Sequence, residues 1–339
     1  MAGGNMETSS HIRLTSSEIA TLWTSYLNNS MSICVLEYFL KTVEDEQIKS
    51  AIEDGLQYSK EYNQIITEIF NTEEFPIPQG FTETDVNLKA PRLFTDIFII
   101  NFLKSMAKIG LVTYSLSFSI VSREDVRSLY KYCTETTIKL DENSIGVLKK
   151  QGLYIRPPYI SYPDKVRFVH DKSFLAGFTT HRRPLTAQEI TYLFTNIDTN
   201  TLGNTLMLGF AQTAESKDVQ KFIWKGQRIS EKHKKQFSQK LIDEHLPTPG
   251  PWDTGVTKST EAPFSDKLML YMTSFLNTSG ISNYGLAMGA SPRHDLGLLY
   301  ARLVAEIVKF SEDTADLMIE KGWLEEPPQS ENRNKLMNN

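Results

Sequence analysis

Apolar residues recur at helical spacing over long stretches of the chain. In the first stretch, Ile19, Leu22, Trp23 and Tyr26 follow the three-to-four-residue period of an amphipathic helix. Three further stretches with the same period follow before the middle of the chain. The predicted helices cover about residues 19–40, 47–70, 91–120 and 123–151. The first half of the chain is therefore predicted to hold four long helices.

The second half repeats this pattern. The string LTSSEI that begins at Leu14 returns as LTAQEI at Leu185, which is 171 positions later. One residue is lost near position 255, and the offset then becomes 170, which carries Phe94 onto Phe264. The same offset relates further pairs, among them Gly110 and Gly280, Tyr114 and Tyr284, Arg123 and Arg293, Asp125 and Asp295, and Gly152 and Gly322. A register kept over about 145 residues predicts two copies of one domain, and residues kept in both copies are expected to serve the common fold.

Both copies carry the same signals for the ends of helices. Thr15 and Glu18 form a predicted capping box, in which each side chain accepts a hydrogen bond from the other residue's backbone N–H. Gly152 is placed to end the fourth helix, where a left-handed residue is favoured. Further signals are the capping box of Thr186 and Glu189, fourth-helix starts at Ser122 to Asp125 and at Ser291 to Asp295, first-turn carboxylates at Asp96 and Asp266, and a stop at Gly322.

The lengths of the connections predict the topology. Helices one and two, and helices three and four, are joined by only a few residues, which predicts antiparallel pairs. The connection at 71–90 is much longer and rich in proline and glycine, so it can run the length of a helix. One long crossover in a four-helix bundle is typical of ferritin-like proteins. The predicted fold is all-α, with two tandem ferritin-like four-helix bundles, each with a long crossover between helices two and three.

This topology divides the chain into four parts. Residues 12–152 form the first bundle and residues 185–328 form the second. The segment 153–184 is rich in aromatic residues, so we expect it to pack along the bundles and not to act as a flexible linker. The polar tail, residues 329–339, is expected to fray.

Composition narrows the functional classes. A net charge of −5 and a pI near 5.8 argue against a nucleic-acid-binding protein, which needs a basic face. Cys34 and Cys133 stand alone in helical patterns and are expected to be buried thiols in a reducing compartment. The sequence shows no apolar run near the length of a membrane span and no signal-peptide pattern. We therefore expect a cytoplasmic protein without a membrane span.

Several distinctive strings resemble a known family. They are LTSSEIATLW, EFPIPQGFTETDVN, APRLFTD, GLYIRPPYI, RRPLTAQEI, APFSDKL and KGWLEEPP. From about Ile12 to Pro328 the chain resembles the duplicated helical proteins of domain-of-unknown-function family 3231, found in endospore-forming Gram-positive bacteria. The resemblance implies a ferritin-like fold akin to one class of spore-coat proteins, and other spore or coat proteins as partners. It implies no activity, catalytic residue or oligomeric state.

A ferritin-like bundle raises the question of a two-metal site. Such a site needs glutamates and two Glu-x-x-His pairs that point inward. None of the six histidines has a glutamate three residues before it. His233 alone lies within a predicted helix, and its counterpart is Tyr62, so we interpret this position as an aromatic packing site with a polar tip. No nucleophile or phosphate-loop motif occurs either. We expect no metal, no cofactor and no catalytic activity.

One group of small and polar residues in the second copy has two interpretations. Glycine inside a helix costs up to about 1 kcal/mol, so a compensating role is expected. Either the residues let helices approach closely, or they line a small polar pocket. They are Gly280, Ser282, Gly285 and Gly289 of the third helix and Asn196, Asn200 and Asn204 of the first. Close packing predicts that Gly285→Leu destabilises the bundle, whereas a pocket would accept the leucine.

Two functions remain open from the sequence. The first is a structural or interaction protein of sporulating bacteria, associated with the spore and without catalytic activity. The second is a ferritin-like metalloenzyme or a small-ligand-binding protein whose site the motifs do not reveal.

Overall fold

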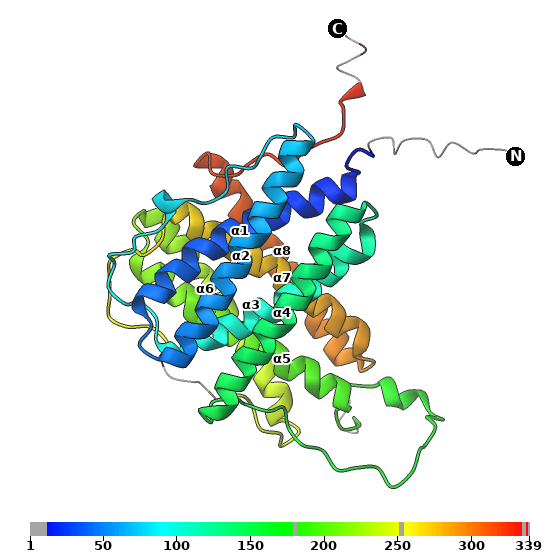
Figure 1. Cartoon of the computed structure of the whole chain (residues 1–339). Helices are drawn as coiled ribbons and strands as arrows, with labels where there is room; N and C mark the ends of the chain where they lie inside the picture. The colour runs from blue at the N-terminus through cyan, green and yellow to red at the C-terminus, as the bar shows by residue number, and fades with distance from the viewer. Residues whose placement is uncertain (1–11, 179–181, 251–253, 334–336, 338–339) are drawn as a thin grey trace, which may run out of the picture.

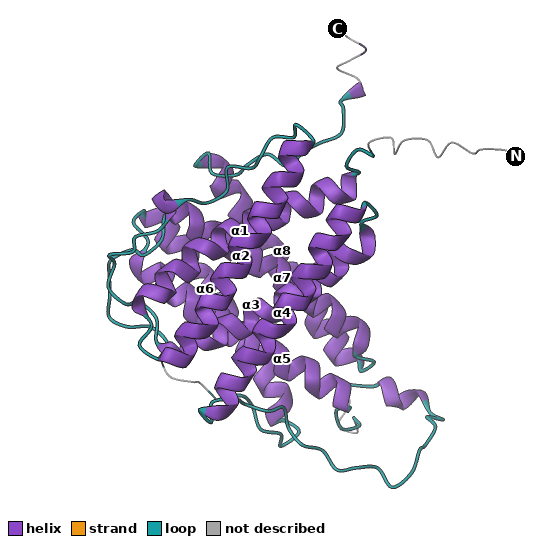
Figure 2. Cartoon of the chain, viewed as in Figure 1, coloured by secondary structure: helices purple, strands orange, loops and turns teal. Residues whose placement is uncertain are grey.

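The computed structural model describes residues 12–178, 182–250, 254–333 and 337. Within these residues all regular structure is helical, and no strand is present (Figures 1 and 2). The α-helices are α1 (Ser16–Thr42), α2 (Glu46–Thr72), α3 (Asp96–Ile120), α4 (Glu124–Lys150), α5 (Ala187–Thr213), α6 (Lys217–Ile242), α7 (Asp266–Ala290) and α8 (His294–Glu320), with short 3-10 helices η1 (Glu83–Asp85) and η2 (Lys172–Leu175). The predicted all-α fold of two four-helix halves is confirmed.

The predicted capping boxes form, and they also join separate helices. The backbone N–H of Thr15 donates to the Glu18 carboxylate at 2.8 Å. The other oxygen of that carboxylate accepts the backbone N–H groups of Ser122 at 3.0 Å and Arg123 at 2.8 Å. Burial alone would raise the pKa of Glu18, but these donors lower it to about 2. The carboxylate therefore stays charged and ties the start of α1 to the start of α4.

This contact corrects the predicted starts of the fourth helices. The N-cap of α4 is Arg123, not Ser122, and it makes no side-chain capping bond. The N-cap of α8 is Arg293, not Ser291, and its N–H donates to Glu189 at 3.2 Å. In each half the glutamate of the first helix accepts a backbone N–H at the start of the fourth helix, and the serine forms no capping bond.

The two halves share one of the three hydrophobic clusters found among the described residues, and each half also has a cluster of its own. Phe94 at the start of α3 contacts Phe210 of α5, with ring centroids 6.4 Å apart. Across the same junction Tyr38 of α1 meets Phe264 edge-on at 5.2 Å. A single buried cluster runs from Met31 through these aromatic rings to residues of α5 and α7. The bundles are therefore not independent units joined by a tether.

The crossover segments that precede α3 and α7 pair with each other. Figure 1 shows both loops, cyan and yellow, along the same edge of the molecule. Their backbone hydrogen bonds come in pairs that the repeat relates: each residue of one bond lies 170 positions from a residue of the other bond. In the first pair, Ser265 N–H donates to Asp85 O at 2.9 Å and Thr95 N–H donates to Gly255 O at 3.1 Å. In the second pair, Asn87 N–H donates to Pro263 O and Thr257 N–H donates to Leu93 O, both at 2.8 Å. This is the isologous pattern of a two-fold dimer, here within one chain.

This pairing explains why α3 begins later than expected. The helical pattern predicts a start near Pro91, but α3 begins at Asp96 after the N-cap Thr95. In this stretch, Leu93 and Thr95 form backbone hydrogen bonds with the other half of the chain instead. The Asp96 carboxylate accepts a hydrogen bond from the backbone N–H of Asp45 at 2.9 Å. Asp266, the equivalent residue of the second half, accepts one from the backbone N–H of Ser216 at 2.9 Å. These carboxylates therefore also hold the α1–α2 and α5–α6 turns.

Helix α3 is more apolar than the sequence pattern suggested. Its 25 residues are long and apolar enough to cross a membrane by length and composition, which corrects the expectation that no segment approaches this limit. Phe98, Ile99, Phe102 and Leu103 are buried in the shared core. Packing against the other half accounts for the apolar composition of the N-terminal part of α3.

The segment between the halves is not packed as expected. Residues 153–178 leave the helices as a long loop (Figure 1). Leu153 and Tyr154 contact the core, but Tyr159, Tyr162 and Phe168 are 86%, 94% and 82% exposed. The prediction that 153–184 packs along the bundles is wrong for the part around these residues, and 179–181 lie outside the described residues. The predicted tail is exposed at 329–333; residues 334–336 and 338–339 are also outside the described residues.

Candidate functional site

Two adjoining cavities lie where the halves meet. An inner chamber of about 70 Å³ is lined by α1, α3, α5 and α7, and an outer chamber of about 260 Å³ is lined by the same four helices. The chambers adjoin each other, because they share lining residues, among them Asn28, Ile109, Leu202 and Phe275. Both halves of the chain are therefore needed to form them.

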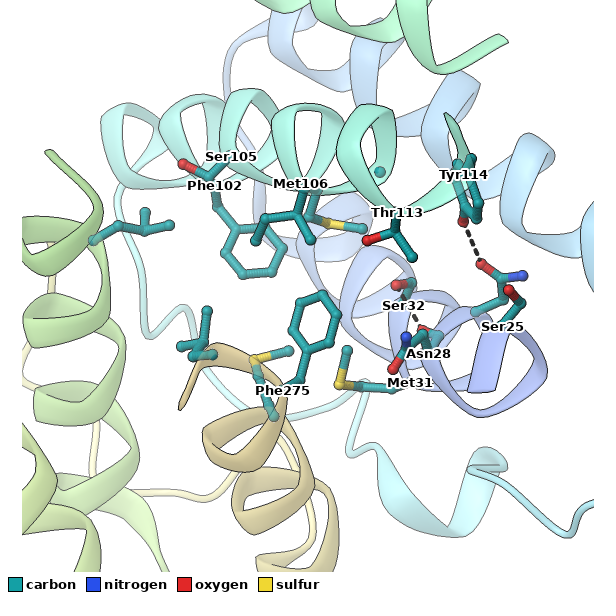
Figure 3. Close-up of a pocket in the computed structure, with 16 residues that line it drawn as sticks. Ser25, Asn28, Met31, Ser32, Phe102, Ser105, Met106, Thr113, Tyr114 and Phe275 are labelled. Carbon is teal, nitrogen blue, oxygen red and sulfur yellow. Dashed lines mark hydrogen bonds between the residues drawn. The ribbon is translucent and has the colours of Figure 1, made fainter. Parts of the chain in front are cut away.

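The inner chamber is largely apolar. Figure 3 shows Phe102 of α3 and Phe275 of α7 pointing toward each other across the space, with Met106 beside them. At its polar edge the Tyr114 hydroxyl donates to Asn29 Oδ1 at 3.0 Å. The Asn29 amide nitrogen is buried and has no hydrogen-bond partner among the described residues. The chamber thus offers a mainly apolar surface, with polar side chains such as Asn29 at its edge.

The outer chamber is lined by both apolar and polar side chains. Ile109 and Val112 of α3 are apolar, and the residues 170 positions later, Ser279 and Ser282 of α7, carry hydroxyl groups. A symmetric dimer would present the same residue twice at these related positions. The two copies have diverged here, whereas they agree at the helix ends that hold the fold. The outer chamber is therefore suited to a molecule with an apolar side and a polar side.

Lys108 is the one charged residue among those that line either chamber. Its neighbour Lys104 forms an ion pair with Asp198 of α5 at 2.9 Å. Lys108 itself makes no ion pair with any described residue, and it is only partly exposed. Burial lowers the pKa of Lys108, and the nearby Asp198 only partly offsets this.

The small and polar residues singled out from the sequence separate into three groups. Gly280 and Asn200 line a third cavity of about 50 Å³ inside the second half, and Ser282 lines the outer chamber. Asn196 is buried, and Asn204 donates to the backbone oxygen of Gln227 on α6 at 3.2 Å. Gly285 and Gly289 are exposed, and a Cβ on either would meet nothing within 4 Å. Close packing is therefore wrong for these two glycines.

The third cavity contains a buried histidine. His233 Nε2 lies 3.0 Å from the Glu306 carboxylate, which fixes this nitrogen as the donor. His233 Nδ1 then accepts from the Tyr284 hydroxyl at 3.1 Å, and Tyr284 accepts from Asn200 at 2.7 Å. Burial lowers the pKa of His233, although Glu306 opposes the shift. Each ring nitrogen has a protein partner, so the histidine holds the bundle interior together.

Metal-ligating side chains do not gather in the part of the chain that the structure describes. There, no three His, Cys, Asp or Glu side chains lie close enough to share an ion. Cys34 and Cys133 are buried free thiols, as predicted, and burial raises the pKa of Cys34 to about 12. The described side chains offer neither a metal cage nor an activated thiol.

Close packing between the halves occurs at a glycine that the sequence did not single out. A Cβ on Gly209 of α5 would lie 2.7 Å from the ring of Phe94. We expect Gly209→Ala to lower the free energy of unfolding by about 1–3 kcal/mol, because the ring cannot shift freely in the shared core. Gly285→Ala, the matched control on an exposed face, should raise stability by about 0.5–1 kcal/mol through helix propensity. Urea unfolding measures both, and equal effects would contradict this placement.

Comparison with known proteins identifies the family of the chain. A crystal structure of a putative spore coat protein from Bacillus halodurans C-125 is similar at 22% identity with a TM-score of 0.40, covering 44% of this chain and 98% of that one. A search of the curated proteins finds no match. A family model described as "Protein of unknown function (DUF3231)" matches residues 3–166 and 173–336, one copy in each half. The chain therefore belongs to the DUF3231 family and contains two copies of its domain.

Proposed function

We propose that this protein binds a small, mainly apolar molecule in the two chambers at the junction of its halves. The observation that carries the proposal is the pair of adjoining chambers, about 70 and 260 Å³, whose exposed lining surface is mainly apolar. An apolar protein cavity of about 150 Å³ accepts benzene, so the two chambers together suit a chain of about ten carbons. Phe102, Phe275 and Met272 would contact the buried end of such a chain.

The lining favours binding without chemical conversion. Neither chamber is lined by a carboxylate, an imidazole or a thiol, the groups that most often transfer protons or form covalent intermediates. Of the functions left open by the sequence, the small-ligand-binding protein fits these chambers best.

The other function, a structural or interaction protein, is favoured by a different observation. The exposed aromatic residues of the 153–178 loop, such as Tyr162 and Phe168, are the kind of surface that binds partners. Association with other spore or coat proteins remains a prediction that rests on the family resemblance, and a cytoplasmic location remains a prediction that rests on the cysteine usage and the lack of a signal-peptide pattern. The time at which the transcript appears during sporulation would test the link with the spore.

Titration with 1-decanol tests the binding proposal. We expect saturable one-to-one binding by calorimetry, because the alcohol buries its chain between Phe102 and Phe275. Ile109→Trp, which fills the space shared by both chambers, should weaken binding by at least about tenfold. Leu298→Trp, at an exposed position of α8, is the control and should bind as the wild type does. Binding that never saturates, or that Ile109→Trp leaves unchanged in a folded protein, would refute the proposal.

A further inference from the structure

We propose that the bound molecule carries one anionic group, a carboxylate or a similar monoanion, which pairs with Lys108 while the apolar chain extends into the inner chamber. This inference rests on the proposed function, because it specifies the chemistry of a ligand of the same chambers. The structural basis is the position of Lys108 in the outer chamber, together with the lack of an ion-pair partner for its ammonium group among the described residues.

The neighbouring charges leave Lys108 available. Asp198 is the acidic residue that acts on it, and the Asp198 carboxylate already bonds to Lys104 at 2.9 Å. Because a carboxylate on a ligand would meet an ammonium group that is partly removed from water, their attraction would be stronger than at an open surface. Burial lowers the pKa of Lys108, and an adjacent anion would offset this cost of keeping it charged.

The divergence of the two copies gives the ligand a direction. The residue related to Lys108 by the repeat is Thr278, whose hydroxyl donates to the Ser274 carbonyl at 3.1 Å. The chamber therefore has a cation on one side of the pseudo-two-fold axis and an uncharged side chain on the other. A molecule with one anionic end matches this arrangement, whereas a symmetric dianion would leave one end without a cation.

The difference between the two chambers indicates where each end of the ligand would lie. Lys108 lines the outer chamber and does not line the inner one. The inner chamber is walled by Met31, Phe102, Met272 and other apolar side chains. An anionic group at Lys108 would thus stay in the outer chamber, where Ser105 and Thr113 of the same helix also carry hydroxyl groups, and the apolar chain would fill the deeper space.

Matched ligands and matched variants test whether an anionic group of the ligand pairs with Lys108. Calorimetry would compare decanoate with 1-decanol, which has the same chain length and no charge, on the wild type, Lys108→Met, Lys108→Arg and Thr278→Met. We expect Lys108→Met to weaken decanoate binding by at least about tenfold and to change 1-decanol binding by less than about threefold. Lys108→Arg should retain most of the decanoate affinity because it keeps the positive charge. Thr278→Met places the same side chain at the related position and should leave the preference between the ligands unchanged.

The possible outcomes separate the inference from the proposed function. If both ligands bind the wild type and Lys108→Met weakens them equally or not at all, the anionic group is refuted while ligand binding stands. If neither ligand binds the wild type, the proposed function fails and this inference fails with it. Thermal melting of each variant shows that it is folded, and the 1-decanol affinity of Lys108→Met confirms that its chambers are intact.

Discussion

Arg293→Met is expected to lower the free energy of unfolding by about 3–5 kcal/mol, the usual cost of removing one partner from a buried ion pair. The Arg293 side chain is fully buried and pairs with Asp295 at 2.8 Å and with Glu244 at 2.9 Å. Burial alone would raise the pKa of Asp295, but Arg293 and Lys240 hold it at about 2. Methionine fills most of the space but leaves these carboxylates without their main cation.

The first half provides the matched control for this prediction. Arg123 stands at the related position and pairs with Glu73 and Asp125, but the Asp125 side chain is 47% exposed. Water can solvate the Asp125 carboxylate that Arg123→Met leaves behind, whereas the Glu73 side chain is only 8% exposed. We therefore expect a smaller loss than for Arg293→Met, about 1–3 kcal/mol. Urea unfolding of both variants gives the comparison. A loss for Arg293→Met no greater than that for Arg123→Met would show that burial does not set the cost.

Residues 12–152 expressed alone are not expected to form a folded monomer. Phe94, Phe98 and Met31 belong to the core shared with α5 and α7, so the isolated half would expose them to water. The crossover would also lose its partners, which include Gly255 and Pro263 of the other half. We expect two copies of this half to associate about the same two-fold axis, with light scattering showing twice the mass of the half.

Co-expression with residues 182–333 is the control for this experiment. It supplies the natural partner and should yield a one-to-one complex in place of the self-associated half. A well-folded monomer of residues 12–152, with a cooperative melt and no tendency to associate, would contradict the shared core.

The helices could be predicted from the sequence because their information is local. The spacing of Leu22 and Tyr26, and the capping box of Thr15 and Glu18, act within one or two turns. The start of α3 was mispredicted because residues just after Pro91 bond to the other half, a contact with no local signal. The aromatic content of 153–184 did not reveal its exposure either, because composition alone does not show whether a surface exists to pack against.

The candidate site was only partly predictable. Three of the predicted residues line cavities, namely Gly280, Asn200 and Ser282, but Gly285 is exposed to solvent. The main chambers were missed because they form between helices of different halves, and helix periodicity does not show how the halves meet. The repeat supplied only part of the signal. Comparing residues kept in both copies identified those that serve the fold, but most paired positions differ between the copies, as Lys108 and Thr278 do, so a difference alone does not mark a chamber wall.

A crystal structure of the protein with 10-bromo-1-decanol would show whether the chambers bind an apolar chain, because the bromine can be located by its anomalous scattering. We expect one bromine peak in the inner chamber, within about 4 Å of Phe102, Phe275 or Met272 side-chain atoms. A bromine peak at another place on the protein, or well-ordered crystals grown at saturating ligand whose chambers hold no peak, would contradict this expectation.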